Sequence, residues 1–118
     1  MLDIIRQRRI LWLVFTFIET RLFAKLADEH LGDDGLLELQ LHLLRQPEVG
    51  SLVRGSGGVR KARWALPGRG KSGGIRVIYF LRSKQGQIWL LTLYPKNVAD
   101  SIPSHVLRKI REEIAERV

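Results

Sequence analysis

Apolar residues in the first half of the chain follow two patterns. The run 10–18 is rich in Trp, Val, Phe, Thr and Ile, and its length and composition predict one strand buried on both faces. Further on, apolar residues recur at helical spacing from Leu22 to Leu26, behind a threonine, Thr20, that can cap a helix. We therefore expect a strand followed by a helix of about two turns over residues 20–27.

The next segment is dominated by leucine. Leucines at 36, 37, 39, 41, 43 and 44 predict a largely buried helix over residues 36–46. The Gly-Asp-Asp-Gly sequence at 32–35 should break the chain and supply an Asp cap for this helix. Pro47 should end it, because proline donates no backbone hydrogen bond and the residue before proline resists the helical conformation.

The second half of the chain is strand-like. Residues 59–65, 74–82 and 87–94 are rich in β-branched and aromatic residues, and the Ser-Lys-Gln-Gly loop at 83–86 predicts an antiparallel hairpin between the last two segments. Ser101-Ile102-Pro103 resembles a helix start. An apolar stripe then predicts a terminal helix; its members are Val106, Leu107, Ile110 and Ile114. The order predicts an α+β domain with one small antiparallel sheet of about four strands, two N-terminal helices and a C-terminal helix.

Length and composition narrow the possible functions. The 118 residues fit a single domain over 1–118. Arg6, Arg8 and Arg9 before the first apolar run look somewhat like a secretory signal. No small-residue cleavage site follows, and the run is far shorter than the ~20 residues of a membrane helix, so we expect a cytoplasmic protein with no membrane association.

The charge balance points to a polyanionic partner. Twenty Lys and Arg stand against twelve Asp and Glu, which gives a formal charge of +8. Nucleic acid is the leading partner class, although such charge can also maintain solubility or serve an acidic protein partner. The absence of cysteine excludes disulfides, thiolate metal sites and cysteine nucleophiles, and three scattered histidines argue against structural zinc. We expect no metal or cofactor.

Residues 54–71 hold a basic block without an acidic residue. The strand period of two puts Lys61 and Arg63 on one face and Arg60 on the other. If the neighbouring strand pairs in a suitable register, Arg76 joins the first two in a cationic platform that can bind an anion. Further expected RNA contacts are Arg60, Arg69, Lys71 and Arg82. The Gly-rich turn that carries Arg69 and Lys71 is not a Walker loop, and its alternative interpretation is a flexible turn with two exposed cations.

Three segments, 55–64, 68–80 and 91–97, resemble the core of RelE/HigB-family toxins, closest to the HigB branch. The likeness also takes in 17–23 and covers about 12–117. It implies a barrel-like antiparallel sheet flanked by helices, ribosome-dependent cleavage of mRNA in the A site, and neutralisation by a helix-turn-helix antitoxin. Residues 1–10 extend beyond the usual start of the family, and no role is assigned to them.

The resemblance also carries candidate catalytic residues. Lys61 and Arg63 match the family's paired cations, and Arg76 matches its strand arginine. Tyr94 and Lys96 fall where the family has an aromatic or basic catalytic element, and this match is looser. The final helix lacks the tyrosine of the RelE branch, which leaves the general base open.

A metal-free ribonuclease must deprotonate a 2′-hydroxyl, stabilise a phosphorane and protonate the leaving 5′-oxygen. Lys61 can be the base only if the neighbouring Arg63 and Arg76 lower its pKa, as crowded like charge does by disfavouring the protonated form. Tyr94 is the competing candidate. Arg63 and Arg76 suit charge stabilisation, since each can grip phosphate through two hydrogen bonds. Lys96 could assist the leaving group.

Two alternative functions without catalysis would use the same basic residues. One is an RNA- or ribosome-binding module without turnover. The other is an inactive toxin-like interaction protein whose basic groove receives an acidic segment of a partner. A native gel with RNA separates these two, and a map of strand breaks in transcripts separates both from the enzyme.

Overall fold

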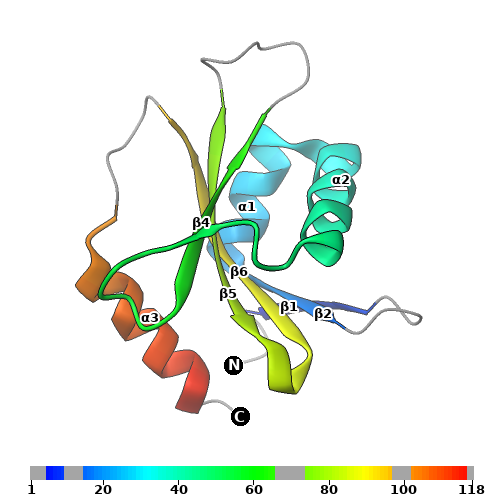
Figure 1. Ribbon diagram of the computed structural model, residues 1–118. Helices are drawn as coiled ribbons and strands as arrows, with labels where there is room; N and C mark the ends of the chain where they lie inside the picture. Colours follow the sequence, from blue (N-terminus) through cyan, green and yellow to red (C-terminus); the bar gives the residue numbers. More distant parts are fainter. Residues whose placement is uncertain (1–4, 10–14, 66–73, 97–101, 117–118) are drawn as a thin grey trace.

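The computed structural model describes residues 5–9, 15–65, 74–96 and 102–116. Its strands are β1 (Ile5–Arg9), β2 (Thr16–Thr20), β3 (Ser51–Leu52), β4 (Val59–Trp64), β5 (Ile75–Arg82) and β6 (Gln87–Pro95). Its helices are α1 (Arg21–His30), α2 (Gly32–Arg45) and α3 (Ser104–Glu116), with a 3-10 turn, η3 (Ser83–Gln85), between β5 and β6. The sheet stands between two helical layers, with α1 and α2 on one face and α3 on the other (Figure 1). This confirms the expected α+β class with two N-terminal helices and one C-terminal helix.

The sheet is larger than expected and is mixed. Its strand order is β1-β2-β6-β5-β4-β3. All neighbouring pairs are antiparallel except β2 and β6, which run parallel. The expectation of about four antiparallel strands was therefore wrong in number and in one pairing. The missed strands are β1, whose Ile-Arg-Gln-Arg-Arg sequence lacks a strand pattern, and β3, which has only two residues.

The N-terminal strand also differs from the expected one. We expected a single strand over 10–18, whereas β2 begins at Thr16, and residues 10–14 lie outside the described residues. Phe17 and Ile18 are buried on opposite faces of the sheet, as expected for a strand covered on both sides. β1 pairs with β2 along its whole length, so part of the N-terminal extension enlarges the sheet.

Both N-terminal helices form, but their starts differ in chemistry. Thr20 caps α1 as predicted, since its Oγ1 accepts a hydrogen bond from the backbone N–H of Phe23 at 3.0 Å. The expected Asp cap of α2 was wrong, because Gly32–Gly35 already form its first turn and the N-cap residue is Leu31. Carboxylates in the first turn still interact favourably with the helix dipole. The end of α2 before Pro47 agrees with the prediction.

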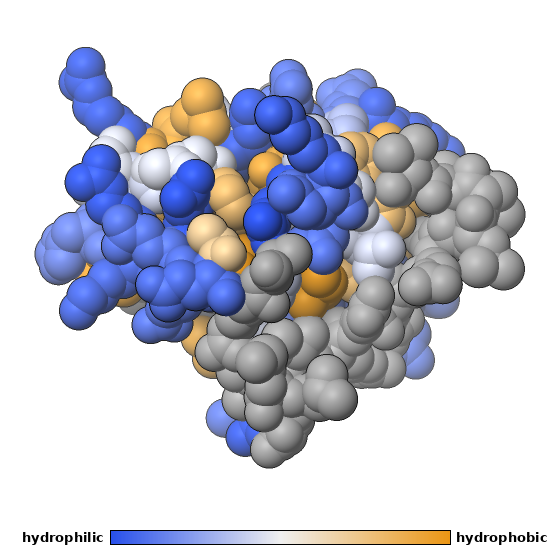
Figure 2. All heavy atoms as spheres, turned by 90° about the horizontal axis from the view of Figure 1, so that it is seen from below, coloured by the Kyte–Doolittle hydropathy of each residue, from blue (hydrophilic) through white to orange (hydrophobic). Residues whose placement is uncertain are grey.

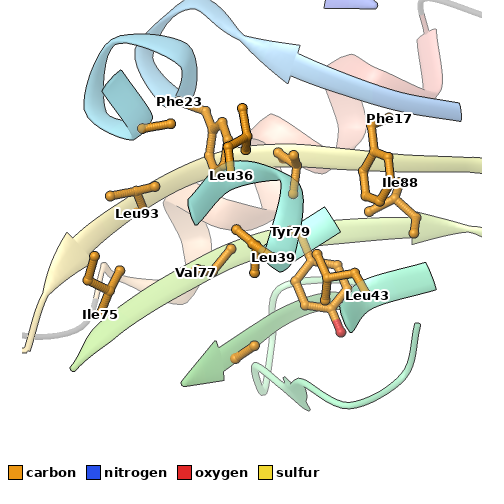
Figure 3. Packing of buried hydrophobic residues seen from close by; sticks show 13 residues of the cluster. Phe17, Phe23, Leu36, Leu39, Leu43, Ile75, Val77, Tyr79, Ile88 and Leu93 are labelled. Atoms are coloured by element: carbon orange, nitrogen blue, oxygen red, sulfur yellow. The ribbon is translucent and has the colours of Figure 1, made fainter. Parts of the chain in front are cut away.

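Two apolar cores fill the space between the sheet and its helices. The α1/α2-side core brings Leu36, Leu39 and Leu43 of α2 onto β5 and its neighbours, around Val77 and Tyr79 (Figure 3). The α3-side core packs Leu107 and Ile114 of α3 onto the other face; its strand members are Ile18, Val59, Ile78, Phe80, Trp89 and Leu91. On the outside, hydrophilic side chains gather where α3 lies (Figure 2). Because alternate residues of each strand belong to the two cores, these cores show which strand positions face α3.

Candidate active site

A row of polar side chains crosses three strands on the face of the sheet that carries α3. Arg63 of β4 lies directly opposite Arg76 of β5, and Arg76 lies directly opposite Tyr94 of β6. Directly opposed residues in antiparallel strands have Cβ atoms about 4.5–5.5 Å apart. The side chains of Arg63, Arg76 and Tyr94 are therefore attached at neighbouring positions on one face of the sheet.

Lys61 joins this row from the next position on the same face of β4. It lies opposite Ile78 of β5 and Ser51 of β3, and Ile78 belongs to the α3-side core. Its diagonal distance to Arg76 is therefore roughly 7–8 Å between Cα atoms. The register thus produces the cationic platform that the alternation of residues predicted.

The platform opens into a depression of ≈ 460 Å³ at the β3 side of the sheet. Its lining residues are Val49, Ser51, Lys61, Ala62, Arg63 and Arg76. No acidic residue is among them, and within the described part of the chain none of the three cations pairs with a carboxylate. Their positive charge is therefore available to an anion such as a phosphate.

Tyr94 reaches the row because β6 contains a β-bulge. The register of β5 with β6 shifts between Ile78 and Tyr79, so that Leu91 has no opposed residue in β5. The carbonyl oxygen of Leu91 accepts a hydrogen bond from Thr20 Oγ1 at 2.8 Å, which ties the bulge to the cap of α1. A bulge of this kind re-aims the residues that follow it.

The Tyr94 phenol is neutral at physiological pH. Burial raises its pKa above the ordinary value of 10.0, because desolvation disfavours the phenolate, and the nearby Arg76 opposes this shift only in part. Its ring packs against the α3-side core. Such a hydroxyl is better suited to donate a hydrogen bond or a proton than to act as a base.

Lys96 lies just beyond the end of β6, two residues after Tyr94. Its backbone N–H donates to the carbonyl oxygen of Gly74 at 3.0 Å, which ties the end of β6 to the start of β5. Its side chain is exposed. The structure therefore places Lys96 next to the row, but gives its ammonium no fixed partner among the described residues.

Arg60 points away from the platform. Its Nη1 donates to the carbonyl oxygens of Glu48 at 3.1 Å and Gly50 at 2.7 Å, in the connection between α2 and β3. The buried Tyr79 serves the same segment: its hydroxyl donates to the Pro47 carbonyl at 2.7 Å and accepts from the Gly50 N–H at 2.9 Å. We call this arrangement the Gly50 brace.

The Gly50 brace was not foreseen from the sequence, and it supports one wall of the depression. A Cβ atom at Gly50 would lie 2.8 Å from Cε1 of Tyr79 and 3.1 Å from the backbone carbon of Lys61, so the segment packs with no room for a side chain. Val49 and Ser51, which line the depression, flank this glycine. The only sequence signal was a glycine shortly after Pro47, which is not specific.

The other predicted RNA contacts lie elsewhere. Arg82 is six residues along β5 from Arg76, about 20 Å away at the rise of a strand, opposite Gln87. Its Nη1 is buried without a hydrogen-bond partner in the described residues. Arg69 and Lys71 lie outside the described residues. The structure thus brings together Lys61, Arg63, Arg76 and Tyr94, but not Arg60 or Arg82.

Histidine and carboxylate side chains contribute little to this surface. The ring of His42 contacts Trp64 on the α2 side, with 5.3 Å between centroids. Across the described ranges, no group of three or more His, Asp or Glu residues could hold a metal ion. The polar side chains of the row itself are those of arginine, lysine and tyrosine.

The fold and the platform define a small basic α+β protein with a surface suited to a polyanion. A family model described as "RelE toxin of RelE / RelB toxin-antitoxin system" matches residues 16–118. The chain therefore belongs to the RelE toxin family: it is the toxin of a toxin–antitoxin system, and an antitoxin is its partner. The match begins at the start of β2, so β1 lies outside it. Among the described helices, none is long and apolar enough to span a membrane.

Proposed function

We propose that this toxin is a ribosome-dependent mRNA endoribonuclease that inhibits translation in the cytoplasm. The observation that carries the proposal is the row of Arg63, Arg76 and Tyr94 with Lys61 beside it, in a depression without acidic residues. This surface can hold the phosphate that links two nucleotides and leaves a lysine and a phenol within reach of its oxygens.

The proposed reaction uses the platform together with Tyr94 or Lys96. The 2′-oxygen attacks the phosphorus while Lys61, as the neutral amine, takes the 2′-hydroxyl proton. Arg63 and Arg76 stabilise the extra negative charge of the phosphorane. The bond to the 5′-oxygen then breaks, and Tyr94 or Lys96 gives that oxygen a proton. The products are a 2′,3′-cyclic phosphate and a free 5′-hydroxyl.

Dependence on the ribosome follows from the weakness of this acid–base set. Lysine and tyrosine have ordinary pKa values far from 7, whereas efficient general acids and bases titrate close to the working pH. The pKa of Tyr94 lies still further from 7, because burial raises it above the ordinary tyrosine value. Alignment of the mRNA by the ribosome would then supply what the proton transfers lack.

Strand breaks mapped by primer extension test the proposal. Purified toxin is added to a translating extract and, separately, to the same mRNA without ribosomes. We expect breaks only during translation, and their loss with Arg63→Ala but not with Lys25→Ala, an exposed cation on α1. A blank map in both reactions would favour a binding module without turnover, and efficient cutting of naked RNA would favour a self-sufficient ribonuclease.

For the partner, we propose an antitoxin of the helix-turn-helix type encoded beside the toxin gene. It would block the platform or hold the toxin away from the ribosome. Expression of the toxin alone should arrest growth, and coexpression with the neighbouring gene should restore it. Harmless high-level expression of the toxin alone would contradict the proposed toxicity, and with it the need for an antitoxin that neutralises the toxin.

A further inference from the structure

A second depression, of ≈ 400 Å³, lies beside the platform, between β3 and the residues that lead into α3. Its lining residues are Ser51, Leu52, Val53, Arg54, Lys61, Ile102, Pro103 and Ser104. Ser51 and Lys61 line both depressions. The two depressions therefore adjoin at these residues, and we call them together the groove, with Arg76 lining one depression and Arg54 the other.

The walls of this second depression are held in place by short contacts. The backbone N–H of Val53 donates to the carbonyl of Val59 at 2.8 Å, and the turn between them is held by the buried Ser56, whose Oγ donates to the Val53 carbonyl at 2.6 Å. A Cβ atom at Gly55 would lie 3.2 Å from Oγ of Ser104, so the turn packs close to the start of α3. The depression is therefore a fixed feature of the fold.

The chemistry of the lining differs from that of the platform. Val53, Ile102 and Pro103 supply apolar surface, whereas Arg54 supplies an exposed positive charge at the far end. No acidic residue lines it. Apolar surface beside a cation matches a nucleotide, whose base needs a dry contact and whose phosphate needs a positive charge.

We propose that this depression is a second nucleotide subsite, which holds the nucleotide just beyond the pair that the scissile phosphate joins, on the same RNA strand. The inference rests on the proposed function, because Lys61 at the junction is also the proposed base. The base of that nucleotide packs on Val53, Ile102 and Pro103, and its outer phosphate meets Arg54. An RNA strand is favoured over an acidic peptide because the groove continues directly into the phosphate-binding row.

Binding of short RNAs to the purified toxin tests the subsite. The probes are a uridine dinucleotide and a uridine tetranucleotide, both fully 2′-O-methylated so that no 2′-hydroxyl can attack. Wild-type toxin should bind the tetranucleotide more tightly, because only the longer RNA fills both depressions. Arg54→Ala should remove roughly fivefold to tenfold of the tetranucleotide affinity, lower its salt slope by about 0.7, and leave dinucleotide affinity unchanged.

Two further variants and a control separate the subsite from the platform. Ile102→Ser should also weaken only the tetranucleotide, whereas Arg63→Ala should weaken both probes by the same factor. Lys25→Ala removes a charge from α1, on the other face of the sheet, and should change neither affinity. Arg54 is exposed, so Arg54→Ala should keep the fold even if Ile102→Ser does not.

The outcomes distinguish this inference from the proposed function. If wild-type toxin cuts translated mRNA but Arg54→Ala binds the tetranucleotide as tightly as Lys25→Ala does, the second subsite is refuted while the nuclease stands. If Arg54→Ala weakens binding of the purified antitoxin and not of RNA, the groove belongs to the protein partner and the inference is equally overturned.

Discussion

Removal of one hydroxyl group from the Gly50 brace should measurably destabilise the whole domain. Tyr79→Phe keeps the ring but removes the oxygen that donates to the Pro47 carbonyl and accepts from the Gly50 N–H. Gly50 is buried, so its N–H would be left without a partner, which costs about 1–3 kcal/mol. The Pro47 carbonyl is partly exposed and can turn to water, so its loss adds about 0.5–1 kcal/mol.

The sum is about 1.5–4 kcal/mol of unfolding free energy. At about 2.1 cal/mol/K of unfolding entropy per residue, a chain of 118 residues loses about 4 °C of Tm for each kcal/mol, so Tm should fall by about 6–16 °C. Urea unfolding should show a lower midpoint with an unchanged m-value, because the surface exposed on unfolding is the same.

Tyr94→Phe is the matched control. It removes the same atom from a half-buried tyrosine whose hydroxyl makes no hydrogen bond within the described residues, so stability should change by less than about 0.5 kcal/mol. Equal losses in the two variants would show that the brace contributes nothing specific. An unchanged Tm in Tyr79→Phe would refute the reasoning outright.

Other predictions follow from the site and the brace. Arg63→Lys keeps the charge but loses the planar fork, so single-turnover cleavage on ribosomes should slow by roughly 30-fold or more, and a wild-type rate would remove Arg63 from the transition state. Burial raises the pKa of Tyr79, with partial opposition from the Gly50 hydrogen bond and Arg60. The unfolded chain therefore loses the tyrosine proton first as pH rises above about 10, and the stability advantage of wild type over Tyr79→Phe should shrink in urea titrations there and stay constant below it. Gly50→Ala should cost about 1–3 kcal/mol in the same titrations, because its Cβ would meet Cε1 of Tyr79 at 2.8 Å, and a stable variant would mean that the segment can move. Neutralising Arg69 or Lys71 should weaken RNA binding and reduce its salt slope by about one unit, with cleavage at saturation unchanged.

Much of the fold could be predicted because its signals are local. The strands β4, β5 and β6 carry β-branched and aromatic runs, and α1 has its cap and helical spacing in one short segment. Failures came where tertiary contacts decide. The Gly-Asp-Asp-Gly segment was interpreted as a break, although its backbone continues directly as the first turn of α2. The polar β1 is a strand because β2 offers it an edge to pair with.

The candidate site divides in the same way. Alternation along β4 was enough to put Lys61 and Arg63 together and Arg60 on the other face. It could not show that Arg60 would find carbonyl partners twelve and ten residues earlier in the chain. Nor could it show that Arg82 lies at the far end of β5, because only the register of the sheet fixes such distances.

The bulge at Leu91 decides which residue of β6 lies opposite Arg76. Without it, continuation of the pairing Tyr79–Leu90 would put Leu93 opposite Arg76 and turn Tyr94 to the α1/α2 side. Loss of the bulge at unchanged length of β6 would thus replace the phenol of the row by an apolar side chain, whereas deletion of Leu91 would remove the bulge and keep Tyr94 opposite Arg76. In a relative of this toxin with a β6 of the same length, the presence or absence of the bulge would therefore decide whether the residue aligned with Tyr94 lies on the α3 side or on the α1/α2 side of the sheet.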